Sequence, residues 1–260
     1  MTKLAANLTL MFSDLPFLDR FDAAAAAGFK AVECVAPYEA PAEAVAERLD
    51  RNGLELVLFN MGIGDWAAGD RGMAANPERV AEFHDYLSVA ATYARATGCK
   101  QLHIMPGKIP PEANRAAWTH AFVSNARDAA DALADDGIDV MFEPINTKVD
   151  IPGYFYDTTK VALELMDAVN RPNVKLQYDI YHMQIMEGDL ARTIERLLPR
   201  IGHIQIADNP GRNEPGTGEI NYPWLLSRLE SLGYKGWIGC EYRPLGDTLA
   251  GLGWAKPYLA

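Results

Sequence analysis

Apolar residues recur along this chain in eight short runs, and each run is followed by a longer segment rich in alanine and charged residues. Within the runs the apolar positions are nearly continuous rather than strictly alternating, which is typical of strands buried on both faces. The runs cover residues 4–11, 31–35, 54–61, 101–106, 139–145, 174–182, 201–208 and 237–242. We interpret them as eight buried strands.

The segments between the runs carry helix signals. Asn221 stands where it can cap a helix, and Leu225, Leu229 and Leu232 follow at the spacing of one helical face. Gly233 then ends the pattern, as glycine commonly does at a helix C-terminus.

Eight alternations of strand and helix indicate parallel strands joined by right-handed crossovers. We therefore predict an α/β fold, a (β/α)8 TIM barrel, in which residues 1–260 form a single domain. An open, doubly wound sheet is the competing architecture. It is disfavoured because no glycine-rich phosphate-binding fingerprint follows any of the runs.

One connection is unusually long. The segment at about 61–78, after the third strand, is rich in glycine and also contains Trp66 and Arg71. A loop of this length within a compact domain is usually a lid or a binding loop, although a plain surface excursion is the alternative. We predict that it lies over the catalytic face of the barrel.

Charge and cysteine content narrow the function classes. The formal net charge of −11 disfavours nucleic acid or an anionic membrane as a partner, because both would be repelled at long range. The three cysteines are widely spaced and suggest neither a disulfide framework nor a metal site. The N-terminus does not resemble a signal peptide, and no stretch is long and apolar enough to span a membrane. We expect a soluble, cytoplasmic protein.

The last four predicted strands end in polar side chains, namely Glu143, Asp179, Gln205 and Glu241. Active sites of such barrels lie at the C-terminal ends of the strands, so these side chains should converge there. Three carboxylates in an apolar interior repel one another, and a divalent cation would relieve that cost. An all-oxygen donor set favours Mg²⁺ or Mn²⁺ over Zn²⁺. Salt bridges or helix caps are the alternative use of each residue taken singly.

The histidines differ in their settings. His182 lies three residues after Asp179, in the turn that leaves the sixth strand, where it could bind a substrate oxygen or orient a metal ligand. His103 and His203 lie within strands, so we interpret them as core residues or residues of the opposite, bottom face.

A small anionic substrate would need a cationic partner at the same end of the barrel. Arg71, Lys108 and Arg212 are the candidates, because each lies in a loop that follows a predicted strand. For each one, a solvated surface role is the alternative.

Several motifs resemble the hydroxypyruvate isomerase family, which belongs to the wider group of xylose isomerase-like barrels. They are FNMGIGDWAAGDRG from Phe59, FEPIN from Phe142, QYDIYHMQIMEGDL from Gln177, GHIQIADNPGRNEPGTGEINY from Gly202 and GWIGCEYRP from Gly236. The resemblance extends over essentially the whole chain.

This resemblance implies that Glu143 and Glu241 donate and accept the migrating proton, and that both ligate the metal together with Asp179 and Gln205. Related epimerases and endonucleases typically carry histidine where this chain has Gln205, so the chain departs from them and matches the isomerases. The implied reaction converts hydroxypyruvate to tartronate semialdehyde through an enediol.

Three alternatives stay open at this point. A 2-oxo-tetronate isomerase or a keto-sugar epimerase would present the same four residues, and a metal-dependent phosphodiester hydrolase is the alternative from a different class. The sequence also leaves the oligomeric state undecided, a homo-oligomer included.

Overall fold

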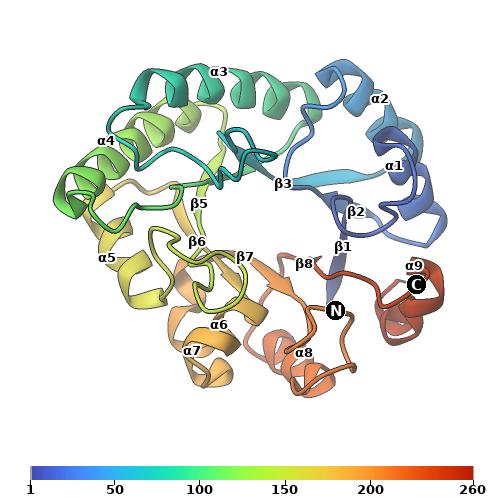
Figure 1. The fold of residues 1–260 in the computed structure, drawn as a ribbon. Helices are drawn as coiled ribbons and strands as arrows, with labels where there is room; N and C mark the ends of the chain where they lie inside the picture. Colours follow the sequence, from blue (N-terminus) through green and yellow to red (C-terminus); the bar gives the residue numbers. More distant parts are fainter. Residues whose placement is uncertain (1, 260) are drawn as a thin grey trace.

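The computed structural model describes residues 2–259, and in it eight parallel strands close into a barrel in the order β1 to β8. Figure 1 looks down this barrel. The closed ring confirms the predicted (β/α)8 architecture and excludes the open sheet. The strands are β1 (Lys3–Asn7), β2 (Ala31–Glu33), β3 (Glu55–Met61), β4 (Gln101–Ile104), β5 (Asp139–Phe142), β6 (Val174–Asp179), β7 (Ile201–Ile206) and β8 (Trp237–Cys240).

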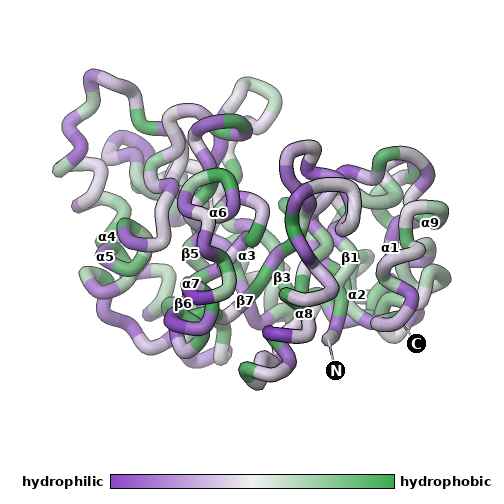
Figure 2. Tube along the Cα trace, turned by 90° about the horizontal axis from the view of Figure 1, so that it is seen from below, coloured by the Kyte–Doolittle hydropathy of each residue, from purple (hydrophilic) through white to green (hydrophobic). Residues whose placement is uncertain are grey.

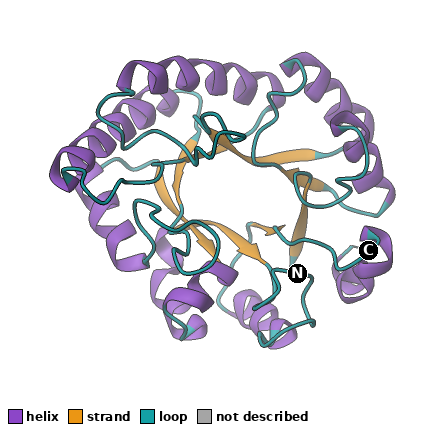
Figure 3. Ribbon diagram, in the orientation of Figure 1, coloured by secondary structure: helices purple, strands orange, loops and turns teal. Residues whose placement is uncertain are grey.

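Helices form the outer layer, and the loops at one end run across the mouth of the ring (Figure 3). None of the helices in the described part of the chain is long and apolar enough to span a bilayer. They are α1 (Phe17–Ala26), α2 (Ala42–Asn52), α3 (Val80–Thr97), α4 (Arg115–Ala134), α5 (Thr159–Val169), α6 (Ile180–Met186), α7 (Leu190–Leu197), α8 (Tyr222–Ser231) and α9 (Thr248–Gly251), with short 3₁₀ segments η1 (Leu198–Arg200) and η2 (Leu252–Tyr258).

The helix predicted after Asn221 is α8. The Asn221 side chain accepts a hydrogen bond from the backbone N–H of Trp224 at 3.3 Å, and Leu225 and Leu229 are buried against the barrel. Other helices of the outer layer also have one buried, apolar face and one exposed, polar face. Hydrophilic and hydrophobic residues therefore alternate closely along the helices in Figure 2.

Several apolar runs extend beyond the strands that they contain. The run at 139–145 holds only the four strand residues Asp139–Phe142, yet the chain stays buried through Asn146. Burial continues because these residues line the mouth of the barrel after the strand ladder has ended. Strand boundaries taken from hydrophobicity alone are therefore too long at the catalytic end.

The interior of the barrel changes character along its axis. An inner apolar cluster is built from Ala5, Ala31, Val57, Leu58 and Met141. Toward the C-terminal ends, the buried side chains become polar. The polar set on the strands comprises Asn7, Glu33, His103, Gln177, Asp179, His203 and Gln205. The inside of the barrel thus holds a small apolar cluster and a larger group of buried polar side chains.

The long loop after β3 is tied down in its second half. Met73 and Ala74 both donate their backbone N–H groups to the carbonyl oxygen of Met105, at 3.1 and 3.0 Å. At Gly72, φ is +99°, and a Cβ atom there would lie 2.3 Å from that same oxygen. Only glycine fits so close to another backbone in this conformation. The first half of the loop, which carries Trp66, is exposed.

We predict that Gly72→Ala destabilises the protein more than Gly69→Ala. The two glycines have nearly the same φ, +99° and +98°, but nothing lies within 4 Å of a Cβ at Gly69. Strain alone should cost about 1 kcal/mol at Gly69, and the added clash should raise the cost to about 3 kcal/mol at Gly72. Urea unfolding of both variants measures the difference. Equal losses would show that the contact with the Met105 carbonyl does not constrain the loop.

Candidate active site

A cavity of about 240 Å³ opens at the C-terminal ends of the strands. Glu143 and Glu241 line this cavity, and they also line a second, smaller cavity of about 20 Å³. Gln205 lines the small cavity as well. A space of this size holds roughly one water molecule or one ion.

The four predicted residues are all withdrawn from solvent. Glu143 and Glu241 come directly after β5 and β8, Asp179 ends β6, and Gln205 lies in β7. Asp179 is fully buried, and the Glu241 side chain is 13% exposed. The fold thus brings Glu143, Gln205 and Glu241 around one small cavity, and Asp179 approaches the group from the side of Glu143.

The two oxygens of Asp179 have different surroundings. Oδ1 accepts hydrogen bonds from the backbone N–H groups of Tyr181 and His182, at 2.7 and 3.2 Å, and so caps α6. Oδ2 is buried and has no hydrogen-bond partner within residues 2–259. The helix cap therefore uses only Oδ1 of Asp179, and Oδ2 is available to a cation.

Burial raises the pKa of Glu143 well above its usual value of 4.5, and the neighbouring carboxylates of Glu241 and Asp179 raise it further. Burial also raises the pKa of Glu241, against the opposing effect of Arg212. Carboxylates crowded in this way are costly to ionise without a counter-charge. The donor set and the unpaired Asp179 oxygen therefore fit a divalent cation.

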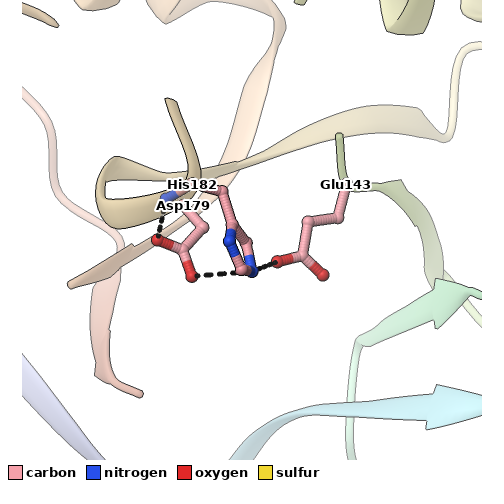
Figure 4. A group of neighbouring side chains, drawn as sticks. All are labelled: Glu143, Asp179 and His182. Carbon is pink, nitrogen blue, oxygen red and sulfur yellow. Dashed lines mark hydrogen bonds and ion pairs between the residues drawn. The ribbon is translucent and has the colours of Figure 1, made fainter. Parts of the chain in front are cut away.

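His182 lies between two of the acidic groups (Figure 4). Its Nε2 is 3.7 Å from Glu143 Oε1 and 3.7 Å from Asp179 Oδ2. On the other side of the ring, Nδ1 lies 2.7 Å from Nδ2 of Asn146. The Asn146 amide orientation is determined, because its Oδ1 accepts backbone N–H groups from Val149 and Asp150.

The orientation of Asn146 determines the tautomer of His182. Because Nδ2 of Asn146 can only donate, Nδ1 of His182 must accept, and the hydrogen of the neutral ring sits on Nε2. Burial lowers the pKa of His182 to about 4, so the ring is neutral at physiological pH. Glu143, Asp179 and His182 each offer a ligand-type atom within 4.8 Å of the others. With its hydrogen on Nε2, however, His182 is a hydrogen-bond donor rather than a metal ligand.

Arg212 bridges two loops of the site. Its guanidinium group donates to Asp150 Oδ1 at 3.0 Å and to Glu241 Oε1 at 3.1 Å, and it lies over the ring of Tyr181. The Arg212 side chain is 13% exposed. Its charge is therefore largely balanced by two carboxylates before any substrate binds.

The other two basic candidates lie in different surroundings. Arg71 lines the larger cavity and stacks on Trp66 of the same loop, 3.9 Å from the ring centroid. Its hydrogen bonds within the described chain go to the backbone oxygens of Trp66 and Asp70. Lys108 is exposed, and the described residues that line the cavity do not include it.

The structure adds residues that the sequence analysis did not assign to the site. His103 is buried as predicted, but its Nδ1 lies 3.4 Å from Glu143 Oε2, so it faces the site rather than the bottom of the barrel. Glu33 ends β2, and the rule used for the last four strands would have found it there. Asn146 and Asp150 lie three and seven residues after Glu143, in the loop that follows β5, and only their tertiary contacts reveal them.

Comparisons with known proteins agree with the architecture. The model of the xylose isomerase-like TIM barrel family matches residues 21–258. The 2-oxo-tetronate isomerase of Cupriavidus necator is 50% identical over 259 residues, which cover 100% of this chain and 99% of that protein. The hydroxypyruvate isomerase of Escherichia coli is 46% identical over 258 residues, covering 99% of this chain and 100% of that protein.

A crystal structure from Brucella melitensis, described as an AP endonuclease of family 2, is 51% identical, with 99% of each chain covered and a TM-score of 0.96. The identities run the length of the chain and join the family match over its barrel. This protein is therefore a member of the xylose isomerase-like TIM barrel family, alongside enzymes named 2-oxo-tetronate isomerase and hydroxypyruvate isomerase.

Proposed function

We propose that the protein isomerises a small 2-oxo-3-hydroxy carboxylate, either hydroxypyruvate or its four-carbon homologue 2-oxo-tetronate. The observation that carries the proposal is the pair of buried glutamates, Glu143 and Glu241, that line both cavities. The names of the relatives at 46% and 50% identity support the same chemistry. The larger cavity, about 240 Å³, is smaller than typical sites for drug-sized ligands, which suits a substrate of a few carbons.

In this proposal Glu143, Asp179, Gln205 and Glu241 hold a divalent cation, and their oxygen donors favour Mg²⁺ or Mn²⁺. When bound, such an ion would polarise the substrate ketone as a Lewis acid. The unpaired Oδ2 of Asp179 and the raised pKa of Glu143 support the assignment.

The reaction moves one proton between adjacent carbons. One glutamate removes the proton from C3 of the 2-oxo acid, which gives an enediol, and the other returns a proton to C2. The hydroxyl proton on C3 leaves and the former ketone oxygen gains one, so the product is a 2-hydroxy-3-oxo acid. Glu143 and Glu241 follow different strands, and we propose that they act on opposite faces of the substrate.

His182 and Arg212 hold the oxygens of the substrate. The Nε2 hydrogen of His182 points toward the space between Glu143 and Asp179, where a ketone or enediol oxygen can accept it. The Nε of Arg212 is buried without a partner among residues 2–259, so that N–H is also available to a substrate oxygen. Both groups orient the reacting carbons against the glutamates.

The substrate carboxylate is best placed at the rim of the cavity. The acidic floor repels an anion, and the Arg212 charge is already balanced by Asp150 and Glu241. Arg71 is held in place by stacking on Trp66. Within residues 2–259 its hydrogen bonds go to uncharged backbone oxygens, so no carboxylate balances its charge through a hydrogen bond. We therefore propose Arg71, rather than Lys108, as the partner of the carboxylate.

The remaining functions are less compatible with this site. A keto-sugar epimerase acts on a neutral sugar and does not need a cation at the rim to bind a carboxylate. A phosphodiester hydrolase must attract DNA, which the net charge of −11 opposes. We also propose that the protein works in the cytoplasm, in keeping with its three buried free cysteines.

Glu143→Gln and Glu241→Gln should each lower kcat by about 100- to 10,000-fold, because each removes one proton-transfer group. The assay loads the protein with Mg²⁺ or Mn²⁺ and follows isomer formation from hydroxypyruvate and from 2-oxo-tetronate by NMR. Glu164→Gln, on the exposed face of α5, is the matched control and should keep full activity. Near-normal turnover in either active-site variant would rule out the two-base scheme, and cleavage of abasic DNA without isomerisation would favour the hydrolase.

Arg71→Ala should raise KM for the acid substrates about tenfold and leave kcat nearly unchanged, because it removes a contact made equally before and during the reaction. Lys108→Ala is the control and should change neither constant. A neutral ketohexose serves as a second substrate class. Unchanged KM in Arg71→Ala, or better turnover of the neutral sugar than of the acids, would argue against a carboxylate-binding role.

Metal-free protein should lose stability as pH rises from about 5 to 8. The folded-state pKa of Glu241 is raised from 4.5 to about 8, and that of Glu143 is raised too, so the folded state retains protons that the unfolded chain releases. A cation replaces those protons, so the rise in Tm caused by Mn²⁺ should grow across the same interval. Thermal unfolding at several pH values, with and without Mn²⁺, measures this. Glu143→Gln should flatten the dependence, and a Mn²⁺ effect that does not change with pH would contradict the site.

A further inference from the structure

The wall of the smaller cavity includes a carboxylate with no part in the proposed reaction, that of Glu33. Glu33 ends β2 and is fully buried, yet three side chains bind its two oxygens. Oε1 lies 2.9 Å from Nδ2 of Asn7 and 2.8 Å from Nε2 of Gln205. Oε2 lies 2.7 Å from Nε2 of His203. Three hydrogen bonds to its two oxygens explain how this acidic group can be buried in the barrel.

The barrel wall leaves room for this carboxylate. A Cβ atom at Gly239, on β8, would lie 2.1 Å from Oε2 of Glu33 and 2.4 Å from its Cδ. Any larger residue at that position would displace Glu33. The arrangement is therefore a fitted compartment, and its contacts come from β1, β2, β7 and β8.

Glu33 restricts how Gln205 can point. A carboxylate only accepts hydrogen bonds, so Gln205 must present its NH₂ group to Glu33, and its carbonyl oxygen must lie on the other side of the amide. That oxygen accepts a hydrogen bond from Nε2 of Gln177 at 2.6 Å and retains a second lone pair. Gln205 lines the 20 Å³ cavity together with Glu143 and Glu241.

We propose that Glu33 is the positioning residue that makes Gln205 an oxygen donor to the cation. The inference rests on the proposed function, because it concerns the same four ligands. An amide has two nearly isosteric orientations, and only one of them offers oxygen; the other would direct N–H groups at a positive ion. Glu33 removes the wrong orientation, and its charge also polarises the amide toward a more negative oxygen.

Glu33→Gln is the direct test, because a glutamine at this position can donate as well as accept and no longer dictates the orientation of Gln205. Binding of Mn²⁺ to the metal-free protein, followed by EPR, should weaken about 10- to 100-fold, the usual cost of removing a residue that orients a ligand. Asn7→Ala is the matched control. It removes another hydrogen bond to the same Glu33 oxygen, leaves Gln205 oriented, and should keep the Mn²⁺ affinity within about threefold.

The exchanged pair Glu33→Gln with Gln205→Glu should restore binding to the parent level or above. It keeps the total charge, and the amide at 33 then donates to a carboxylate at 205 that offers oxygen in either orientation. A purely structural role for Glu33 would not produce this rescue. Equal weakness of the single and the exchanged variants would overturn the inference.

The unaltered protein provides a measurement that does not depend on how the variants fold. In protein with isotope-labelled glutamine, NMR should show the Gln205 amide protons protected from solvent exchange both with and without Mg²⁺, since they stay bonded to Glu33. Free exchange of these protons, or parental Mn²⁺ affinity in Glu33→Gln, would overturn the positioning role while leaving the metal site standing. Absence of Mn²⁺ binding to the parent protein would instead overturn the metal site, and the inference with it.

Discussion

The rest of this structure depends on the burial of negative charge inside the barrel. Glu33, Glu143 and Asp179 are almost or entirely inaccessible, and Glu241 is close to them. Burying an unpaired carboxylate costs folding free energy, so each of these carboxylates needs hydrogen-bond donors or a cation beside it. Arg212 donates a hydrogen bond to Glu241, and three side chains form hydrogen bonds with Glu33. Glu143 has a raised pKa, and Oδ2 of Asp179 has no hydrogen-bond partner within residues 2–259, so we place the divalent ion beside these two groups.

This constraint explains the layered interior. Small apolar residues such as Ala5 and Ala31 pack inside the barrel, and Glu33 with its hydrogen-bond partners lies at the wall of the small cavity. Glu143 and Glu241 line both this small cavity and the larger, open one. Each layer orients the next, so that Glu33 acts on Gln205 and Asn146 acts on His182. In the proposed function, substrate and metal would therefore bind with little rearrangement of these side chains, which favours a proton transfer between adjacent carbons.

The loop after β3 combines a rigid half with an exposed half. Gly72 and the contacts of Met73 with Met105 anchor it to the next loop of the barrel. That anchor carries Arg71 and Trp66 to the rim of the cavity, where we propose that Arg71 binds the carboxylate of an acid substrate. The position of the guanidinium group therefore depends on a backbone contact that only glycine permits.

From the sequence alone the fold class was predicted correctly, and Glu143, Asp179, Gln205 and Glu241 were placed at one end of the barrel. Eight nearly continuous apolar runs can only be satisfied by strands buried on both faces, and the polar residues that end four of them must share one end of a parallel barrel. Hydrophobic patterning could not separate Arg71 from Lys108, give the exposure of either, or reveal the partners of Glu33. Those depend on distances between residues far apart in the chain: Glu33 and Gln205 are separated by 172 positions and meet at 2.8 Å. Only the closed barrel brings such pairs into hydrogen-bond range, because hydrogen bonds need a specific geometry that a periodic pattern does not encode.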